Sequence, residues 1–87
     1  MNTPSLLEFP TEFPIKVVGR PDGDVRAISQ EIVERFAGTL SESSIRERAS
    51  ADGNFLAITY LIVAQSQAQL DDIYRELSAC KAVIMAL

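Results

Sequence analysis

The chain has 87 residues, of which 47% are hydrophobic and 23% charged, and its formal net charge is −4. A chain of this length is expected to form one domain, residues 1–87, around a single core. The absence of histidine and the single cysteine, Cys80, exclude most zinc, haem and iron–sulfur sites, Ser-His-Asp and Cys-His catalytic groups, and a disulfide within the chain. We therefore expect neither a metal nor another cofactor.

The charge distribution also bears on partners. Eight basic residues are scattered among twelve acidic ones, whereas binding to nucleic acid or an anionic membrane requires a basic stripe. The first residues lack the basic and apolar regions of a secretory signal, and no apolar run reaches the ~18 residues of a membrane span. We expect a cytoplasmic protein that binds neither nucleic acid nor membrane.

The motif EFP occurs twice within residues 8–14 and leads into an apolar, β-branched stretch. Residues 13–19, FPIKVVG, predict a strand bounded by proline and glycine. Proline has no N–H to offer a ladder, so Pro14 is expected at the strand start. The two phenylalanines of the motif are expected to cap one end of the core, which makes residues 1–11 an ordered N-terminal arm.

The next segments predict a helix, a hairpin and a long strand. Residues 25–37 carry apolar side chains at helical spacing, begin after a cap at Asp22 or Asp24, and end at Gly38. The polar, weakly alternating residues that follow, 41–50, are typical of an edge strand. The sequence Asp52-Gly53 then predicts a hairpin, and the apolar residues 55–64 predict a central strand.

Residues 66–77 predict a second helix, because Ser66 and Gln69 have capping-box spacing and one apolar stripe follows. Asp71 and Arg75 are four residues apart, in the order that favours an ion pair. Residues 82–87 predict a last strand.

The resulting order is βαββαβ. Right-handed crossovers place both helices on the same face of the sheet. The predicted fold is therefore a ferredoxin-like α/β (α+β) sandwich with a four-stranded antiparallel sheet. The first and third strands should be central, and the first and last should be neighbours.

Three stretches, LLEFPTEFPIKVVG, GNFLAITYLIVA and IYREL before VIMAL, resemble the YbeD-like family of small bacterial proteins. The resemblance runs over nearly the whole chain. It implies a ferredoxin-like fold similar to the ACT-type regulatory domains of amino-acid metabolism. The family is functionally uncharacterised, so the resemblance implies no enzymatic activity and no catalytic residues.

A first candidate site is the turn between the first strand and the first helix, which contains Gly19, Arg20, Asp22, Gly23 and Asp24. A helix N-terminus attracts carboxylates, and ACT domains bind amino acids at the corresponding turn. The acidic side chains would repel an anion, and many such turns contain glycine and aspartate. A plain turn is the favoured interpretation, and a ligand site is the alternative.

The second candidate is the open face of the sheet, meaning the face turned away from the helices. Strict alternation places Met85 and Leu87 toward the helices and directs five hydrophobic side chains to the open face: Val18, Phe55, Leu61, Val63 and Ile84. So apolar a face indicates an interface, and we expect a homodimer. Cover by the N-terminal arm or by the C-terminal residues within the monomer is the alternative.

These observations favour a non-enzymatic regulatory or adaptor domain that acts through protein–protein contacts. The alternative is an ACT-like sensor that binds an amino acid or similar carboxylate at the first turn. RNA recognition, which also uses βαββαβ domains, is disfavoured because Phe55 is the only candidate aromatic on the open face of its strand and the basic residues of such domains are missing.

Overall fold

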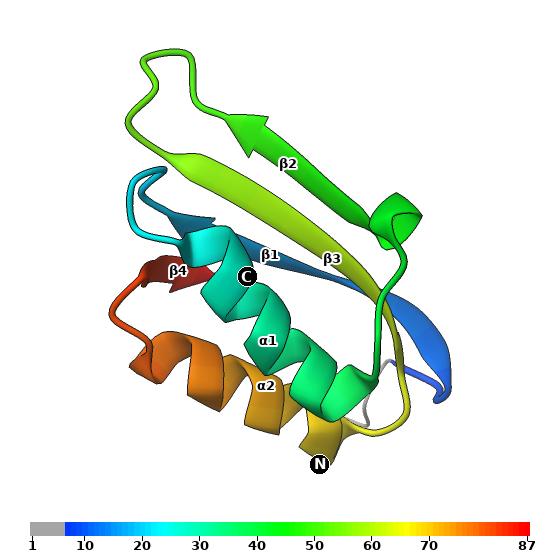
Figure 1. The fold of residues 1–87 in the computed structure, drawn as a ribbon. Coiled ribbons are helices and arrows are strands. Elements are labelled where there is room, and N and C mark those ends of the chain that lie inside the picture. Colours follow the sequence, from blue (N-terminus) through cyan, green and yellow to red (C-terminus); the bar gives the residue numbers. More distant parts are fainter. Residues whose placement is uncertain (1–6) are drawn as a thin grey trace, which may run out of the picture.

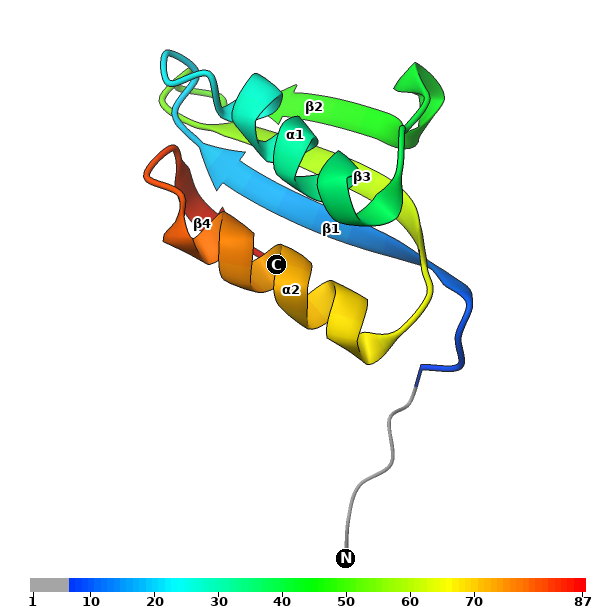
Figure 2. The same cartoon turned by 60° about the horizontal axis from the view of Figure 1, so that its bottom comes forward.

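The computed structural model describes residues 7–87. The elements are β1 (Thr11–Gly19), α1 (Val25–Ala37), the 3₁₀ turn η1 (Glu42–Ser44), β2 (Ile45–Ala49), β3 (Leu56–Ala64), α2 (Gln67–Ala79) and β4 (Val83–Ala86). The strands form one antiparallel sheet in the order β2-β3-β1-β4. Both helices lie on one side of the sheet (Figures 1 and 2). The ferredoxin-like fold, the two central strands and the β1–β4 neighbours are confirmed.

The core lies between the helices and the two central strands. β1 pairs with β3 along its whole length, from Thr11 opposite Ala64 to Gly19 opposite Leu56. Alternate side chains of both strands point at the helices, and the fully buried large ones come from four elements: Ile15, Val17, Val25, Val33, Ile58, Tyr60, Ile62, Leu70, Ile73 and Leu77. Burial of this apolar surface is the main stabilising term of the fold.

One polar contact joins α1 to β3 inside this core. The Tyr60 hydroxyl lies 2.6 Å from Ser29 Oγ and donates to the Arg26 carbonyl at 3.1 Å. Ser29 in turn donates to the Val25 carbonyl at 2.6 Å. Both side chains are fully buried, so these bonds compensate for the loss of water around the two hydroxyl groups. The contact fixes how α1 sits over the sheet.

Pro14 is not at the start of its strand, because β1 begins at Thr11. The amide of Lys16 donates to the carbonyl of Leu87, so alternate residues of β1 direct their N–H groups toward the β4 side. The nitrogen of Pro14 also faces this side, but no residue of β4 lies opposite it. The pairing of β1 with β4 covers Val17–Gly19 and the two backbone bonds of Lys16. The missing N–H therefore interrupts no ladder, and the strand extends through the proline.

The described part of the lead-in packs against the core. Leu7, Phe9 and Phe13 are partly buried against it, and the Phe13 ring meets Tyr74 edge-on at 6.5 Å between centroids. The predicted capping by the two phenylalanines is confirmed. The expected arm over residues 1–11 falls partly on residues 1–6, which lie outside the described part of the chain.

The prediction that Met85 and Leu87 face the helices is wrong. Val18 pairs with Met85 whereas Gly19 pairs with Val83, so β4 contains one extra residue between these two pairs, as in a β-bulge. That residue breaks the strict alternation. Met85 joins Val18 on the open face, and Leu87 pairs with Lys16 there. Their exposed fractions, 48% and 62%, agree with this placement.

Two local predictions also change. Residues 42–44 form η1 instead of strand, because the Ser44 amide donates to the Ser41 carbonyl at 3.0 Å and nearby serine hydroxyls bond locally. In α2 the Ser66 cap is confirmed by a 3.1 Å bond from the Gln69 amide. Arg75 pairs at 2.8 Å with Asp72, three residues away, instead of with Asp71.

The buried tyrosine predicts a loss of stability at alkaline pH. Burial raises the pKa of Tyr60 above the ~10 of an unfolded chain. The folded protein holds this proton more tightly, so the stabilisation is full below pH ~10 and is lost as the pH rises toward the folded-state pKa. We expect the free energy of unfolding in urea to fall more steeply with pH above ~10 in the wild type than in Tyr60→Phe.

The half-buried Tyr74 provides the comparison, because burial raises its pKa as well. A Tyr60→Phe/Tyr74→Phe variant should show the shallowest alkaline slope of the three proteins. A Tyr60→Phe slope equal to that of the wild type would contradict the assignment. At neutral pH the lost hydroxyl should cost Tyr60→Phe about 1 kcal/mol.

Candidate functional site

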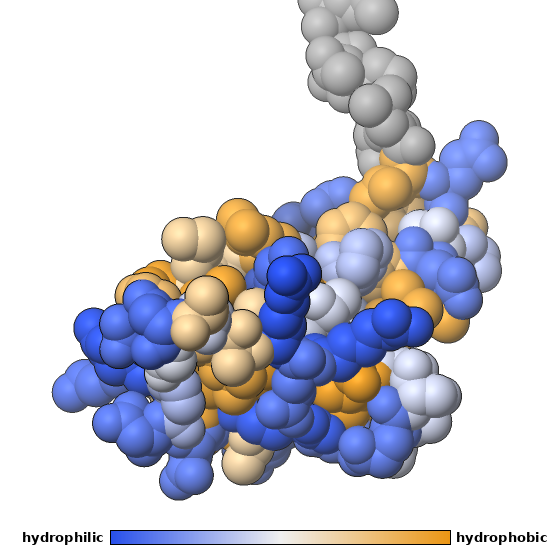
Figure 3. Space-filling model, turned by 90° about the horizontal axis from the view of Figure 1, so that it is seen from above, coloured by the Kyte–Doolittle hydropathy of each residue, from blue (hydrophilic) through white to orange (hydrophobic). Residues whose placement is uncertain are grey.

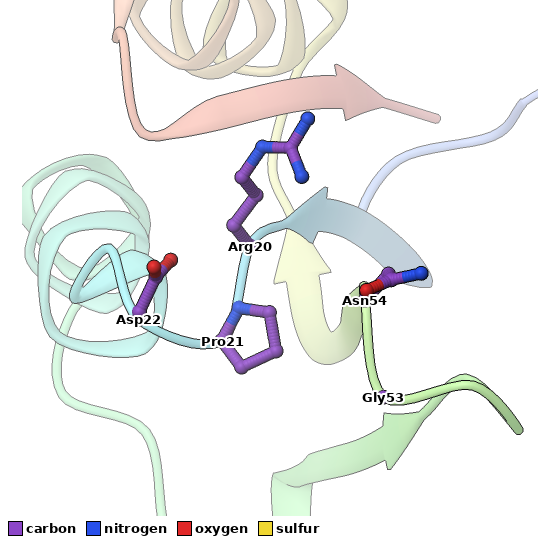
Figure 4. Close-up of a pocket in the computed structure, with 5 residues that line it drawn as sticks. All are labelled: Arg20, Pro21, Asp22, Gly53 and Asn54. Carbon is purple, nitrogen blue, oxygen red and sulfur yellow. The ribbon is translucent and has the colours of Figure 1, made fainter.

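The turn predicted as a ligand site lies beside a small hollow. Two loops meet there, the β1–α1 loop and the β2–β3 hairpin. The hollow has a volume of about 230 Å³ and is lined by Arg20, Pro21, Asp22, Gly53 and Asn54 (Figure 4). The hairpin side of this hollow was not anticipated from the sequence, because the pairing that brings the two loops together joins residues far apart in the chain.

The polar side chains around this hollow do not converge on one point. In Figure 4 the guanidinium of Arg20, the carboxylate of Asp22 and the amide of Asn54 point in different directions. The Arg20 guanidinium carbon lies 5.8 Å from the centroid of the Phe55 ring, a cation–π contact. Arg20 is thus held toward the open face instead of over the turn.

The two glycines of the turn differ in how closely they are packed. A Cβ on Gly19 would lie 2.5 Å from Val25 Cγ2 and 2.6 Å from the Ala82 carbonyl oxygen, which no side chain could occupy without movement. Gly23 is less constrained, since its Cβ would come no nearer than 3.6 Å to the Arg20 carbonyl oxygen. Its amide closes the turn by donating to that oxygen at 3.2 Å.

Asp24 is the residue that caps α1, but its side chain accepts no capping hydrogen bond. Its φ of 56° places it in the left-handed region, which aspartate tolerates better than most residues. The first helical bond runs from the Ile28 amide to the Asp24 carbonyl at 3.0 Å. The position of the cap agrees with the sequence; the expected side-chain bond does not form.

The predicted interface residues lie together on the open face or along its β4 edge. Their exposed fractions are substantial for large hydrophobic side chains, namely Phe55 39%, Leu61 40%, Val63 52% and Ile84 49%, while Val18 is partly buried. Met85 and Leu87 enlarge the set. Figure 3 shows exposed hydrophobic side chains directly beside strongly hydrophilic ones when the molecule is seen from above.

Strand alternation places Lys16 on this face, but the sequence interpretation missed two further cations there, Arg46 and Arg48. The alternation of Arg46 and Arg48 along residues 41–50 was a visible signal, because residues two apart in a strand share a face. Which face they share, and that Arg46 and Lys16 flank Thr59 from opposite sides, depends on the register of three strands. Basic residues therefore do gather on the sheet.

Three further features of residues 7–87 bear on the kind of site: possible metal ligands, the free cysteine and the character of the helices. No group of three or more His, Cys, Asp or Glu side chains in this range could hold a metal ion. Cys80 is free and partly buried against the core. Within the same residues, no helix combines the length and apolar character that crossing a membrane requires.

The fold places the chain among ferredoxin-like α+β domains. The solution structure of the C-terminal domain of the MgtC protein from Mycobacterium tuberculosis superposes with a TM-score of 0.58. It covers 94% of this chain and 89% of its own, at 19% sequence identity. At that identity the likeness concerns the fold alone.

The chain belongs to the DUF493 family of proteins of unknown function, whose family model matches residues 4–87. A UPF0250 protein of Leptothrix cholodnii is 43% identical over 95% of this chain and 91% of its own length. A UPF0250 protein of Nitrosomonas europaea is 33% identical over the full length of both. These relatives confirm the YbeD-like resemblance, and their names are not those of enzymes.

The packing around Gly19 yields a test of its structural role. We expect Gly19→Ala to destabilise the protein by about 1–3 kcal/mol, because the added methyl group must displace Val25 or the Ala82 backbone. Gly23→Ala is the matched control in the same loop and should change stability by less than ~0.5 kcal/mol. Urea unfolding of both variants measures the difference. Equal stabilities would rule out close packing as the reason for Gly19.

Proposed function

We propose that this protein is a non-enzymatic regulatory or adaptor domain that holds a partner protein on the open face of its sheet. The observation that carries the proposal is the unequal covering of the two faces. Both helices cover one face, while large hydrophobic side chains remain exposed on the other. Contiguous exposed apolar surface of this kind usually marks an interface.

The homodimer expected from the sequence would use this face and remains a prediction. The exposed apolar side chains favour it. Two copies meeting at the centres of their open faces would also bring Lys16, Arg46 and Arg48 of one copy near those of the other. Like charges brought together across an interface oppose binding, so the face suits a partner of different composition at least as well.

An ACT-like sensor is the second candidate, and the hollow of about 230 Å³ beside the β1–α1 loop supports it. The amino-terminal end of α1 carries the positive end of the helix dipole, which favours a carboxylate. The exposed Arg20 would have to leave the Phe55 ring to reach a ligand there. Asp22 would oppose an anion in the same hollow.

Site-specific photo-crosslinking in the native cells tests the adaptor proposal. A crosslinking residue at Leu61, on the open face, should yield a covalent product with a second protein chain. The control position Glu31 is exposed on α1, on the covered side, and should yield none. A product of twice the chain mass would assign the face to a homodimer. The same products from both positions, or none from Leu61, would contradict the proposal.

Thermal denaturation tests the sensor. A bound amino acid should raise stability by about 2.7 kcal/mol at a hundred times its dissociation constant. Arg20→Ala should remove most of that gain if Arg20 holds the ligand carboxylate. A panel of amino acids and acyl metabolites that leaves the melting temperature unchanged would eliminate this candidate.

A further inference from the structure

The open face carries a row of side chains that the strand register sets side by side. Arg46 of β2 pairs with Thr59 of β3, Thr59 pairs with Lys16 of β1, and Lys16 exchanges backbone bonds with Leu87. Directly opposite residues in an antiparallel sheet point to the same face. Two long cations therefore flank one short hydroxyl side chain.

The next row has one cation, at its β2 end, and hydrophobic side chains at its other end. Arg48 pairs with Ala57, Ala57 with Val18, and Val18 with Met85. The short side chains of Ala57 and Thr59 leave a hollow of about 370 Å³ between the longer ones. We call this hollow the basic basin, and its lining residues are Lys16, Arg46, Glu47, Arg48, Ala57 and Thr59.

The cations of the basin have no acidic partner among residues 7–87. The ion pairs in this range use Arg26, Arg35 and Arg75. The one acid that lines the basin, Glu47, is held by Arg26. The protein as a whole carries a net charge of −4, so the basin concentrates positive charge on an acidic molecule. Such a local charge attracts an anionic partner.

The side chains around the basin are hydrophobic, and most of them are aliphatic. Leu61 and Val63 continue β3 on the same face, and Met85 ends the second row. Glu12, opposite Val63, places a negative charge at the far end. A ligand that fills this surface must therefore offer negative charge over the basin and apolar side chains beside it.

We propose that the open face binds an acidic, aliphatic segment of a partner protein, with its carboxylates over the basic basin and its apolar side chains on Leu61, Val63 and Met85. This inference rests on the proposed adaptor function and specifies its partner. Single-stranded RNA fits less well, because its bases stack on two or three aromatic rings of a sheet. Phe55 is the aromatic side chain beside the basin, and its ring is already in a cation–π contact with Arg20.

Amide NMR titration of the full chain with synthetic peptides tests the proposal. The probe is a short peptide in which leucine and glutamate alternate. It should shift the amides of Lys16, Arg46 and Thr59, and its affinity should weaken with added salt. In Arg46→Ala/Arg48→Ala the affinity should fall about tenfold, the loss expected for removing two charge-assisted contacts.

The matched control removes two positive charges from another side of the protein. Arg75 lies on α2, Lys81 lies in the α2–β4 loop, and both are exposed. Arg75→Ala/Lys81→Ala should change the affinity less than twofold, because it alters the net charge but not the basin. Equal losses in the two double variants would overturn the proposal, since the attraction would then be non-specific.

Further probes separate the possible failures. If a leucine–lysine peptide bound as tightly as the leucine–glutamate peptide, the proposal of an acidic partner would be wrong, but the adaptor function would not be contradicted. If free glutamate shifted the same amides by the same amount, the ligand of the basin would be a small anion and not a protein segment. Oligouridylate binding more tightly than any peptide would overturn both proposals. No shift from any peptide would overturn the acidic segment, and the adaptor would then depend on crosslinking at Leu61 alone.

Discussion

The antiparallel pairing of β1 with β3 is the constraint on which the rest of the structure depends. It extends from Thr11 opposite Ala64 to Gly19 opposite Leu56 and sorts two apolar strands into a helix-facing set and an open set. A shift of one residue would exchange the two sets. The buried Tyr60 hydroxyl, bonded to α1, holds the helix layer over the buried set.

The same register has opposite consequences at its two ends. At Gly19, β1 passes so close to Val25 and the Ala82 carbonyl that a side chain has no room, and the turn into α1 is correspondingly tight. At the other end β1 runs past β4, which gives Pro14 a position where its missing N–H costs nothing. The loop that resembles a ligand site in sequence is thus partly explained by packing.

The distribution of charge links the fold to the proposed function. On the helix side, Arg26 is paired with Glu42 and Glu47, which ties α1 to η1 and β2. On the open side, Lys16 and Arg46 have no acidic partner within residues 7–87. Arg26 on the helix side is thus paired, whereas the two cations on the open side lie unpaired, among the described residues, beside exposed aliphatic side chains. This arrangement suits the binding of a partner of opposite charge, as we propose.

The sequence by itself determined the order of elements, the helix ends at Ser66 and Gly38, and the apolar character of the open face, because these depend on local periodicity and capping. Only the tertiary structure decided that Met85 leaves the helix side, through one extra residue in β4. Only it placed Arg46 and Lys16 on either side of Thr59. Strand register joins residues distant in the chain, and no local pattern encodes it.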